Sequence, residues 1–405
     1  MFGERSIDLT NVWQGLFTGL SLPRGFRQES VSLHKNRFSD PAICWRPISN
    51  KDTYSAIKQI VEKLDLGCIS EVEASGEPAI ASENYRVLLG GNKRVLIKRC
   101  SAGESEEFLS ALHHTIEFIR DNGIKAPALM PVDRQNGRVA AEINGERWLA
   151  YEFVPAFSHF MGREKNVYQA AFQIGHFDKV LIKYAQEFPE IVSKHYKASG
   201  WEGAGLQNPK LLYLLWQGIR RAVKRSAEDD KNIKLLNSCK VSIHETLKSY
   251  ADIFPELQFI GDKKQIIHND IHPHNILMDI RSGAWLIDLH LMSERSIYTE
   301  IGWAFYQIVK HAALDTCDQY GNISKKDLKK LGKAFRKGYC TGNPGIEWNT
   351  DMIYGYALNE SLALLFHHLN NIYIQGNRRW EFDLARHLHD IKDIQIIMRE
   401  GLFPC

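Results

Sequence analysis

Three side chains with hard oxygen atoms follow one another at a spacing that suits phosphoryl transfer. Asp270 lies in a polar loop, Asn275 follows five residues later, and Asp288 stands on the strand after the next turn. When a phosphoryl group passes to a hydroxyl, a loop aspartate accepts or orients the hydroxyl proton, while an asparagine and a second aspartate hold Mg²⁺ on the nucleotide phosphates. Carboxylate and amide oxygens suit Mg²⁺ rather than a soft metal. The spacing predicts Asp270 as a catalytic residue and Asn275 and Asp288 as magnesium ligands.

Short apolar runs surround these residues. They lie at 266–267, 276–278 and 284–287, and a turn at 281–283 separates the last two. Short apolar runs bounded by turn residues predict buried strands. An aspartate alone in a loop is most often a turn residue, so the prediction for Asp270 depends on its neighbours and their spacing.

The whole segment resembles a known family. His268 to Asn275 reads His-Asn-Asp-Ile-His-Pro-His-Asn, and Ile287-Asp288 follows it. This is similar to the aminoglycoside phosphotransferase and choline kinase family, relatives of protein kinases that phosphorylate small molecules, where His-Gly-Asp-Leu-His-Pro-x-Asn precedes Ile-Asp. The resemblance implies an α+β, bilobal protein-kinase-like fold with a small β-rich N-lobe and a large, mainly helical C-lobe. It also implies ATP and Mg²⁺ as cofactors.

The resemblance gives the loop histidines their expected roles. His272 matches the second histidine of the family motif, and we expect it to brace Asp270 or to lie near phosphate, as part of the catalytic set. His268 is expected to be structural, with its imidazole hydrogen-bonded to the loop backbone. With His274, these residues could also suggest a transition-metal site, but the motif already accounts for them.

Two positions depart from the family pattern. After Asp288 the family usually has an aromatic residue and then an acid, whereas this chain has Leu289 and His290. A histidine adds no negative charge to a metal site, so a second-metal role is weakened. Glu300 stands where the family usually has an aspartate that caps the next helix and braces the loop. Neither change removes a predicted catalytic group, but together they lower the expected activity.

The pattern upstream predicts the strands of an N-lobe. Apolar runs at 69–72, 84–89 and 94–98 read as strands, and Gly90-Gly91-Asn92 is a strong hairpin turn between the last two. A flexible connection followed by a strand that ends in lysine is how a kinase N-lobe grips a nucleotide. Lys98 is therefore the expected contact to the α- and β-phosphates, and the alternative is a solvent-facing lysine.

Polar residues before the second strand take the place of a glycine-rich loop. The order resembles the homoserine-kinase-like branch of the family, in which this loop is poor in glycine and depends on serine and asparagine. The resemblance points to Ser82 and Asn84 as nucleotide contacts.

A helix is predicted from 104 to 121, because apolar residues recur at helical spacing and Asn122-Gly123 ends the pattern. The equivalent helix in the family supplies a glutamate that pairs with the strand lysine. Its usual place falls near His113 or His114, which is a departure. We expect Glu117, one turn later, in preference to Glu107, unless another group holds the lysine.

Residues 148–155 resemble the last N-lobe strand and the hinge. In the family, hinge backbone groups bind adenine, which points to the N–H and C=O groups of Glu152, Phe153 and Val154.

The chain divides into three predicted parts. Residues 1–48 are an N-terminal extension, either a packed arm or a partner-binding segment. Residues 49–154 form the kinase-like N-lobe. Residues 155–405 form a helical C-lobe with the catalytic loop and the acceptor pocket. Its helices are predicted at 167–188, 211–225, 233–253, 298–314, 325–339, 351–371 and 380–398.

Bulk composition limits the partners. The chain has 405 residues, 44% of them hydrophobic, and a net charge of +3, which calls for neither nucleic acid nor an anionic membrane. The basic run 220–225 is interpreted as a solvated helix face. No apolar run approaches the length of about 20 residues that a membrane span needs. Seven scattered cysteines without a C-x-x-C pair fit a cytoplasmic location. Oligomeric state stays open.

The sequence therefore predicts an ATP- and Mg²⁺-dependent phosphotransferase. Its acceptor is the hydroxyl of a small molecule: a sugar, amino alcohol, hydroxy amino acid or aminoglycoside-like compound. The charge of the acceptor stays open, because the C-lobe carries both acidic and basic candidates. One alternative is a protein Ser/Thr kinase, which the missing Asp-Phe-Gly to Ala-Pro-Glu segment disfavours. The other is a nucleotide-binding scaffold with little activity that docks a partner through residues 1–48.

Overall fold

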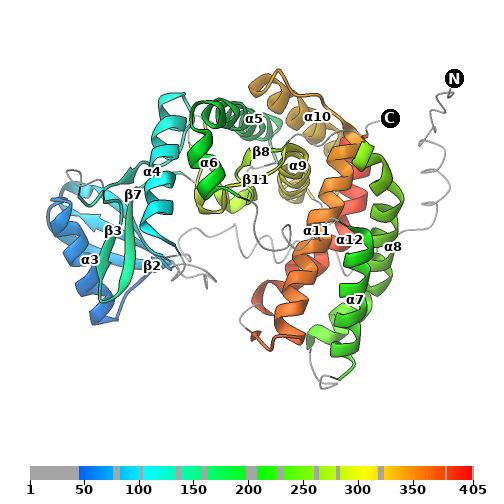
Figure 1. Ribbon diagram of the computed structural model, residues 1–405, viewed down its shortest axis with the longest axis horizontal. Helices are drawn as coiled ribbons and strands as arrows, with labels where there is room; N and C mark the ends of the chain where they lie inside the picture. The colour runs from blue at the N-terminus through cyan, green and yellow to red at the C-terminus, as the bar shows by residue number, and fades with distance from the viewer. Residues whose placement is uncertain are drawn as a thin grey trace.

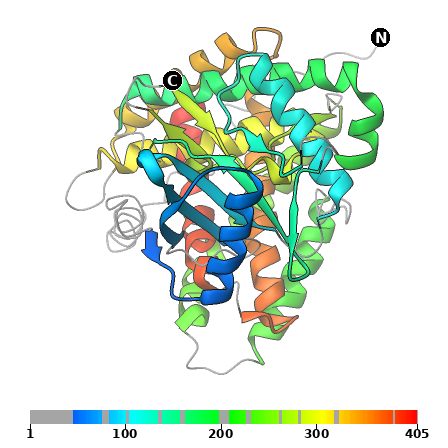
Figure 2. The same cartoon turned by 90° about the vertical axis from the view of Figure 1, so that its left-hand side faces the viewer.

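The computed structural model describes most of the chain in two lobes. The described residues are 45–75, 83–100, 104–133, 138–156, 162–197, 208–225, 231–259, 264–279, 283–317, 323–378 and 381–403. A β-rich N-lobe and a mainly helical C-lobe lie side by side (Figure 1), and Figure 2 looks onto the N-lobe with the C-lobe behind it. The predicted bilobal α+β fold is confirmed.

An antiparallel sheet forms most of the N-lobe. Its strands lie in the order β1-β2-β3-β4-β7-β5, and β6 pairs with β7. The bounds are β1 Trp45–Pro47, β2 Ile69–Ser75, β3 Glu83–Leu89, β4 Arg94–Arg99, β5 Leu129–Met130, β6 Ala141–Ile143 and β7 Glu146–Glu152. The turn between β3 and β4 places Gly91 and Asn92 at φ values of 77° and 61°, which these two residue types tolerate best.

The first strand lies within the predicted N-terminal extension. Trp45 pairs with Ser75 and Pro47 with Glu73, so β1 forms the edge of the N-lobe sheet. The sheet thus begins inside the segment 1–48, and residues 1–44 lie outside the described part of the chain.

Two helices cover opposite faces of this sheet (Figure 1). On one face, α3 (Lys51–Lys63) buries Ile57 and Ile60 against sheet residues such as Val87 and Ile97. Asn50 caps this helix by accepting from two backbone N–H groups at 2.9 and 3.2 Å. On the other face lies α4 (Glu106–Asp121), whose buried residues join the core of the C-lobe.

Helices build the C-lobe. They are α5 Glu164–Glu187, α6 Pro189–His195, α7 Pro209–Val223, α8 Lys231–Phe259, α9 Ile297–Leu314, α10 Lys325–Gly342, α11 Thr350–Tyr373 and α12 Glu381–Leu402. They lie where the helical periodicity predicts, with α6 as an added short helix. Within the described residues, no helix has the length and apolar character needed to span a bilayer.

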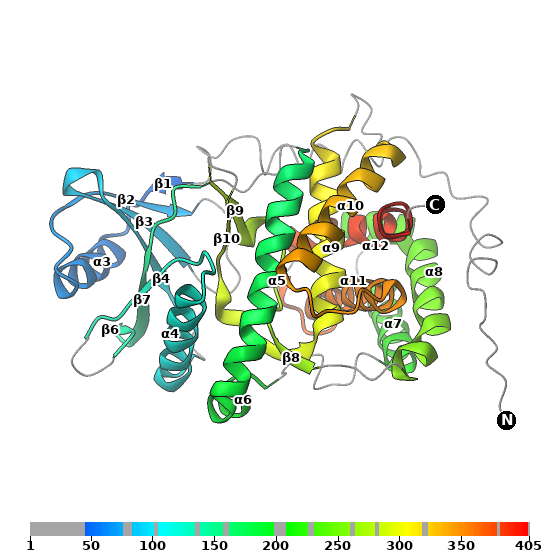
Figure 3. The same cartoon turned by 90° about the horizontal axis from the view of Figure 1, so that it is seen from above.

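Two small antiparallel sheets lie in the C-lobe. β8 (Lys264–Ile267) pairs with β11 (Ser293–Ser296), and β9 (Ile276–Met278) pairs with β10 (Ala284–Leu286). Figure 3 shows β9, β10 and α5 on the side of the C-lobe that meets the N-lobe. The loop with Asp270 connects β8 to β9, so the small sheets place this loop at the junction of the lobes.

Candidate active site at the lobe junction

The backbone of the catalytic loop is fixed by a buried glutamate. Asn269 has φ = 66°, a left-handed conformation that asparagine tolerates better than most residues, at the position where the family motif has glycine. Glu300, in the first turn of α9, accepts from the N–H groups of His268 at 3.0 Å and Asn269 at 2.9 Å. Glu300 therefore braces the loop despite its longer side chain, and Asp270 follows directly from the braced residues.

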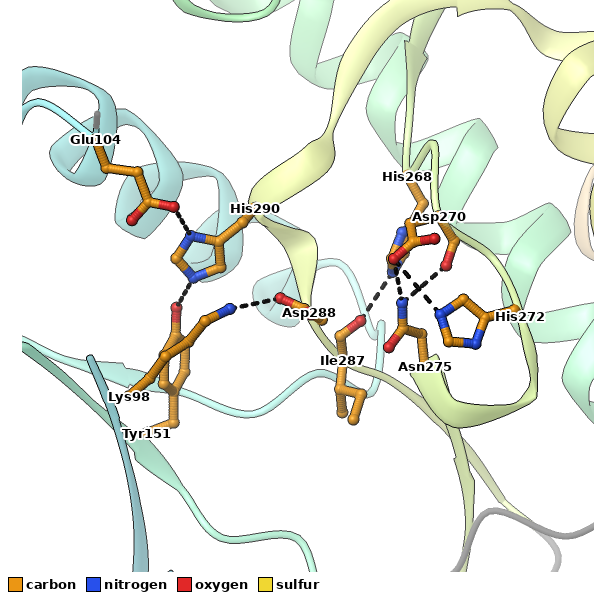
Figure 4. Close-up of polar contacts among 10 residues, drawn as sticks. All are labelled: Lys98, Glu104, Tyr151, His268, Asp270, His272, Asn275, Ile287, Asp288 and His290. Carbon is orange, nitrogen blue, oxygen red and sulfur yellow. Dashed lines mark hydrogen bonds and ion pairs between the residues drawn. The ribbon is translucent and has the colours of Figure 1, made fainter. Parts of the chain in front are cut away.

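The carboxylate of Asp270 lies beside Asn275 and His272 (Figure 4). Asn275 donates from Nδ2 to both the carbonyl and the Oδ2 atom of Asp270, at 2.8 Å each. These two bonds use both amide hydrogens, so Oδ1 of Asn275 is the atom left for a cation. His272 Nε2 lies 3.5 Å from Asp270 Oδ2, which fits its predicted role of bracing the aspartate.

Asp288 and Lys98 bring the two lobes together. Lys98 Nζ lies 2.7 Å from Asp288 Oδ1, and Asp288 has φ = 60°. Partial loss of water acts to raise the pKa of Asp288, but the Lys98 ammonium outweighs it and holds that pKa well below its ordinary value. The Asp288 side chain is still 40% exposed, so an ionised oxygen donor remains accessible at the junction.

Lys98 and Asn84 share one face of the N-lobe sheet. They are directly paired across β3 and β4, and paired residues of an antiparallel ladder point to the same side. The structure therefore brings Asn84 to the face that carries Lys98. Ser82, the other residue predicted for this loop, lies outside the described residues.

His268 is a buried structural residue, as the sequence predicts. Burial lowers its pKa, and its Nε2–H donates to the carbonyl of Ile287 at 2.9 Å. This bond connects the residue before the catalytic loop's left-handed turn with the residue before Asp288. The two halves of the motif are thereby held in register.

The hinge is arranged differently from the prediction at one residue. The Glu152 N–H already donates to the carbonyl of Ala128 at 2.9 Å, and its carboxylate binds Arg120 at 2.9 Å and the Ala128 N–H at 3.2 Å. Its N–H is therefore not open to adenine. The Val154 carbonyl accepts from Ala156 at 2.9 Å, which uses one of its two lone pairs. The expected adenine contacts of Phe153 and Val154 stay predictions.

Glu117 does not fit its predicted pairing with Lys98. Its side chain is 63% exposed and lies 3.6 Å from His113 on the same helix. His114, at the other position where the family pattern places the acid, faces the Tyr184 hydroxyl at 3.0 Å. The turn of α4 that carries His113, His114 and Glu117 thus faces solvent and the C-lobe rather than Lys98.

The structure adds three residues that the sequence reasoning did not place in the site. His290 Nε2 lies 2.7 Å from the Tyr151 hydroxyl, and His290 Nδ1 lies 3.2 Å from Glu104 Oε1. Figure 4 shows this chain beside Lys98 and Asp288. The only sequence signals were the histidine at a usually acidic position and the missing acid near His113.

The four groups Asp270, Asn275, Asp288 and Lys98 lie together at the lobe junction and form a candidate site for phosphoryl transfer. The family model described as the phosphotransferase enzyme family matches residues 78–322, more than half of the chain. The chain therefore belongs to this family. The assignment to its homoserine-kinase-like branch stays a prediction.

Solved structures share the fold at low sequence identity. A spectinomycin phosphotransferase in complex with ADP and spectinomycin has a TM-score of 0.59 at 14% identity, over 85% of this chain and 98% of that one. An aminoglycoside phosphotransferase from Alicyclobacillus acidocaldarius has a TM-score of 0.57 at 13% identity, over 84% and 93%. The amicoumacin kinase hAmiN with AMP-PNP and Ca²⁺ has 0.53 at 13% identity, over 84% and 93%. No curated protein matches the sequence.

Proposed function

We propose that this protein transfers the γ-phosphoryl group of ATP to the hydroxyl of a small molecule. The observation that carries the proposal is that Asp270, Asn275 and Asp288 from the C-lobe lie together with Lys98 from the N-lobe, as Figure 4 shows. Membership of the phosphotransferase family supports the reaction class. A cytoplasmic location, where ATP and Mg²⁺ are plentiful, is part of the proposal.

Each residue has a defined part in the proposed reaction. Asp270 orients the acceptor hydroxyl and takes its proton; the loose transition state of phosphoryl transfer asks for little base strength. Oδ1 of Asn275 and the carboxylate of Asp288 would hold Mg²⁺, which neutralises charge on the phosphates when it is bound. Lys98 turns from Asp288 to the α- and β-phosphates.

The identity of the acceptor is a further part of the proposal, because family membership does not decide it. Structurally similar enzymes were solved with spectinomycin and with hygromycin B, and we propose a sugar, amino alcohol, hydroxy amino acid or aminoglycoside-like acceptor here. Glu360 on α11 is nearly buried and lies 2.7 Å from Arg295. Since Arg295 also binds Asn269 beside the catalytic aspartate, Glu360 serves the loop rather than a cationic acceptor.

A screen of hydroxyl metabolites tests the proposal. Purified protein with Mg·ATP should release ADP faster with one class of compound than with none, and the phosphate should appear on that compound. Parallel reactions without Mg²⁺ and with a protein acceptor are the controls. Labelling of protein alone would favour a protein kinase, and ATP binding without turnover on any acceptor would favour a scaffold.

A further inference from the structure

A largely buried chain of three polar side chains joins the two lobes beside the proposed phosphate-binding pair. Tyr151 belongs to β7, Glu104 lies just before α4, and His290 belongs to the short helical turn Leu289–Leu291 that follows Asp288. The side chains of His290 and Glu104 are 6% and 19% exposed. Because a carboxylate only accepts, His290 donates to Glu104 through Nδ1 and meets the Tyr151 hydroxyl with Nε2.

This chain fixes the turn that carries Asp288. Asp288 is in a left-handed conformation, so its carboxylate direction depends on how the next residues are anchored. His290, two residues on, is held at both ring nitrogens by N-lobe groups. The anchor on the Tyr151 side belongs to β7, whose neighbour β4 carries Lys98. Lys98 and Asp288 are thus both positioned by the N-lobe sheet.

Glu104 places a negative charge against the His290 ring. Burial acts to raise the pKa of Glu104, but the hydrogen bond and charge of His290, together with the charge of Lys98, lower it below its ordinary value. Glu104 is therefore ionised at neutral pH, and its carboxylate carries a charge where it meets His290. Among the described residues, the one ion pair of Lys98 is with Asp288.

The acidic side chains of α4 either have other partners or are exposed. Glu106 accepts from the Val139 N–H at 2.9 Å, Glu107 and Asp121 are exposed, and Glu117 lies against His113. None of them holds Lys98. Glu104, just before this helix, is instead tied to the Asp288 turn through His290.

We propose that Glu104 and His290 are positioning residues for the nucleotide-binding pair Lys98 and Asp288. His290 ties the Asp288 turn to β7 through Tyr151, and the carboxylate of Glu104 holds the other ring nitrogen of His290. Neither side chain contacts the transferred group. This inference rests on the proposed function, because it assigns Lys98 and Asp288 to a magnesium-bound nucleotide.

The test uses the affinity of the full-length protein for Mg·AMP-PNP, measured by calorimetric titration. Glu104→Gln keeps an acceptor for His290 and removes the charge, and His290→Gln removes the two-sided anchor. Each should weaken Mg·AMP-PNP binding about 10- to 100-fold, the usual cost of losing a partner that orients a metal ligand. Binding of adenosine, which has no phosphate, should stay unchanged in both.

The double variant Glu104→Gln/His290→Gln separates positioning from general packing. If the two residues act as one unit, the double variant should lose no more Mg·AMP-PNP affinity than the weaker-binding single variant. Glu106→Gln is the matched control, because Glu106 bonds a neighbouring N–H but not His290; it should leave nucleotide affinity at the wild-type value. Tyr151→Phe, which removes one hydroxyl, provides a milder variant if a glutamine variant folds poorly.

Two results would overturn the inference. One is wild-type Mg·AMP-PNP affinity in the Glu104, His290 and Tyr151 variants. The other is an equal loss of adenosine binding, which would indicate a distorted pocket. A wild-type protein that binds no Mg·AMP-PNP would overturn the proposed function first, and this inference with it.

Discussion

Glu300 holds the catalytic loop with a carboxylate that burial makes hard to ionise. Burial raises the pKa of Glu300 to about 7, although the N–H groups of Asn269 and His268 act to lower it. Asp178 on α5 is also buried, and burial with the charge of Glu300 raises its pKa as well. The Tyr339 hydroxyl donates to Asp178 at 2.5 Å. Glu300 and Asp178 thus lie close together under one loop, and their mutual repulsion favours a proton on at least one of the two carboxyl groups.

The stability of the protein should therefore fall as pH rises through this range. A raised carboxyl pKa means that the folded state binds the proton more tightly than the unfolded state, so the Glu300 contribution is present below its ordinary pKa of 4.5 and is lost by about pH 7. Glu300→Gln should flatten this decline and lower overall stability by about 1–3 kcal/mol, because one amide oxygen replaces two acceptors. Thermal unfolding of the wild type and of Glu300→Gln from about pH 5 to about pH 8 measures how the stability of each changes with pH. Parallel curves would contradict the assignment.

Asp288 gives a second prediction at this scale. Asp288→Ala should weaken binding of Mg·ATP strongly and binding of Mg-free ATP little, because the lost carboxylate is a metal ligand. Nucleotide titrations with and without Mg²⁺ measure the difference. Asp252→Ala, an exposed position on α8, is the control. Equal weakening in both titrations would remove Asp288 from the metal site.

Residue types and local spacing carried the predictions for Asp270, Asn275 and Asp288 because all three lie in one short segment. Glu104 and His290 are 186 positions apart, and no local pattern pairs them. The predicted helix forms as α4, but Glu117 lies one turn from His113 and is 63% exposed, so it does not reach Lys98. Helical periodicity identifies the buried face of a helix, but it does not show which acidic residue beside that face reaches another element.

At the scale of elements, α5 and α10 approach each other unusually closely. A Cβ atom added to Gly338 would lie 2.3 Å from the Tyr168 carbonyl oxygen, and one on Gly342 would lie 2.2 Å from that of Phe172. Both glycines thus let backbone meet backbone. This contact matters to the site, because α5 carries Asp178 beneath the catalytic loop.

Gly338→Ala should lower the stability by about 1–3 kcal/mol, since the added methyl forces the two helices apart. Gly218→Ala on α7 is the matched control: no atom lies within 4 Å of its added Cβ, and alanine should raise stability by about 0.5–1 kcal/mol. Chemical denaturation of the two variants gives both values. A neutral Gly338→Ala would show that the helices can separate without cost.

The helices and the long strands were predictable because each has a sustained hydrophobic period. The edge strand β1 was not, because Trp45–Pro47 is too short to show alternation and contains a proline. The closeness of α5 and α10 was also beyond prediction, since a glycine in a helix does not reveal what it packs against.

At the scale of the molecule, charged pairs join the two lobes at the candidate site. Lys98 meets Asp288 across it, and Lys125 meets Asp279 at 2.9 Å near the end of β9. Each lobe alone has half of the proposed nucleotide site. In the proposed function, the Lys98–Asp288 pair opens when magnesium and phosphates enter, and nucleotide binding exchanges one set of charge partners for another.

The most direct measurement of the central claim is turnover by Asp270→Ala with Mg·ATP and the best acceptor from the screen, beside Mg·AMP-PNP affinity. The account predicts turnover about 10²- to 10⁴-fold below wild type with nearly unchanged nucleotide affinity, while Asp252→Ala matches wild type in both. Near-normal turnover by Asp270→Ala would contradict the account.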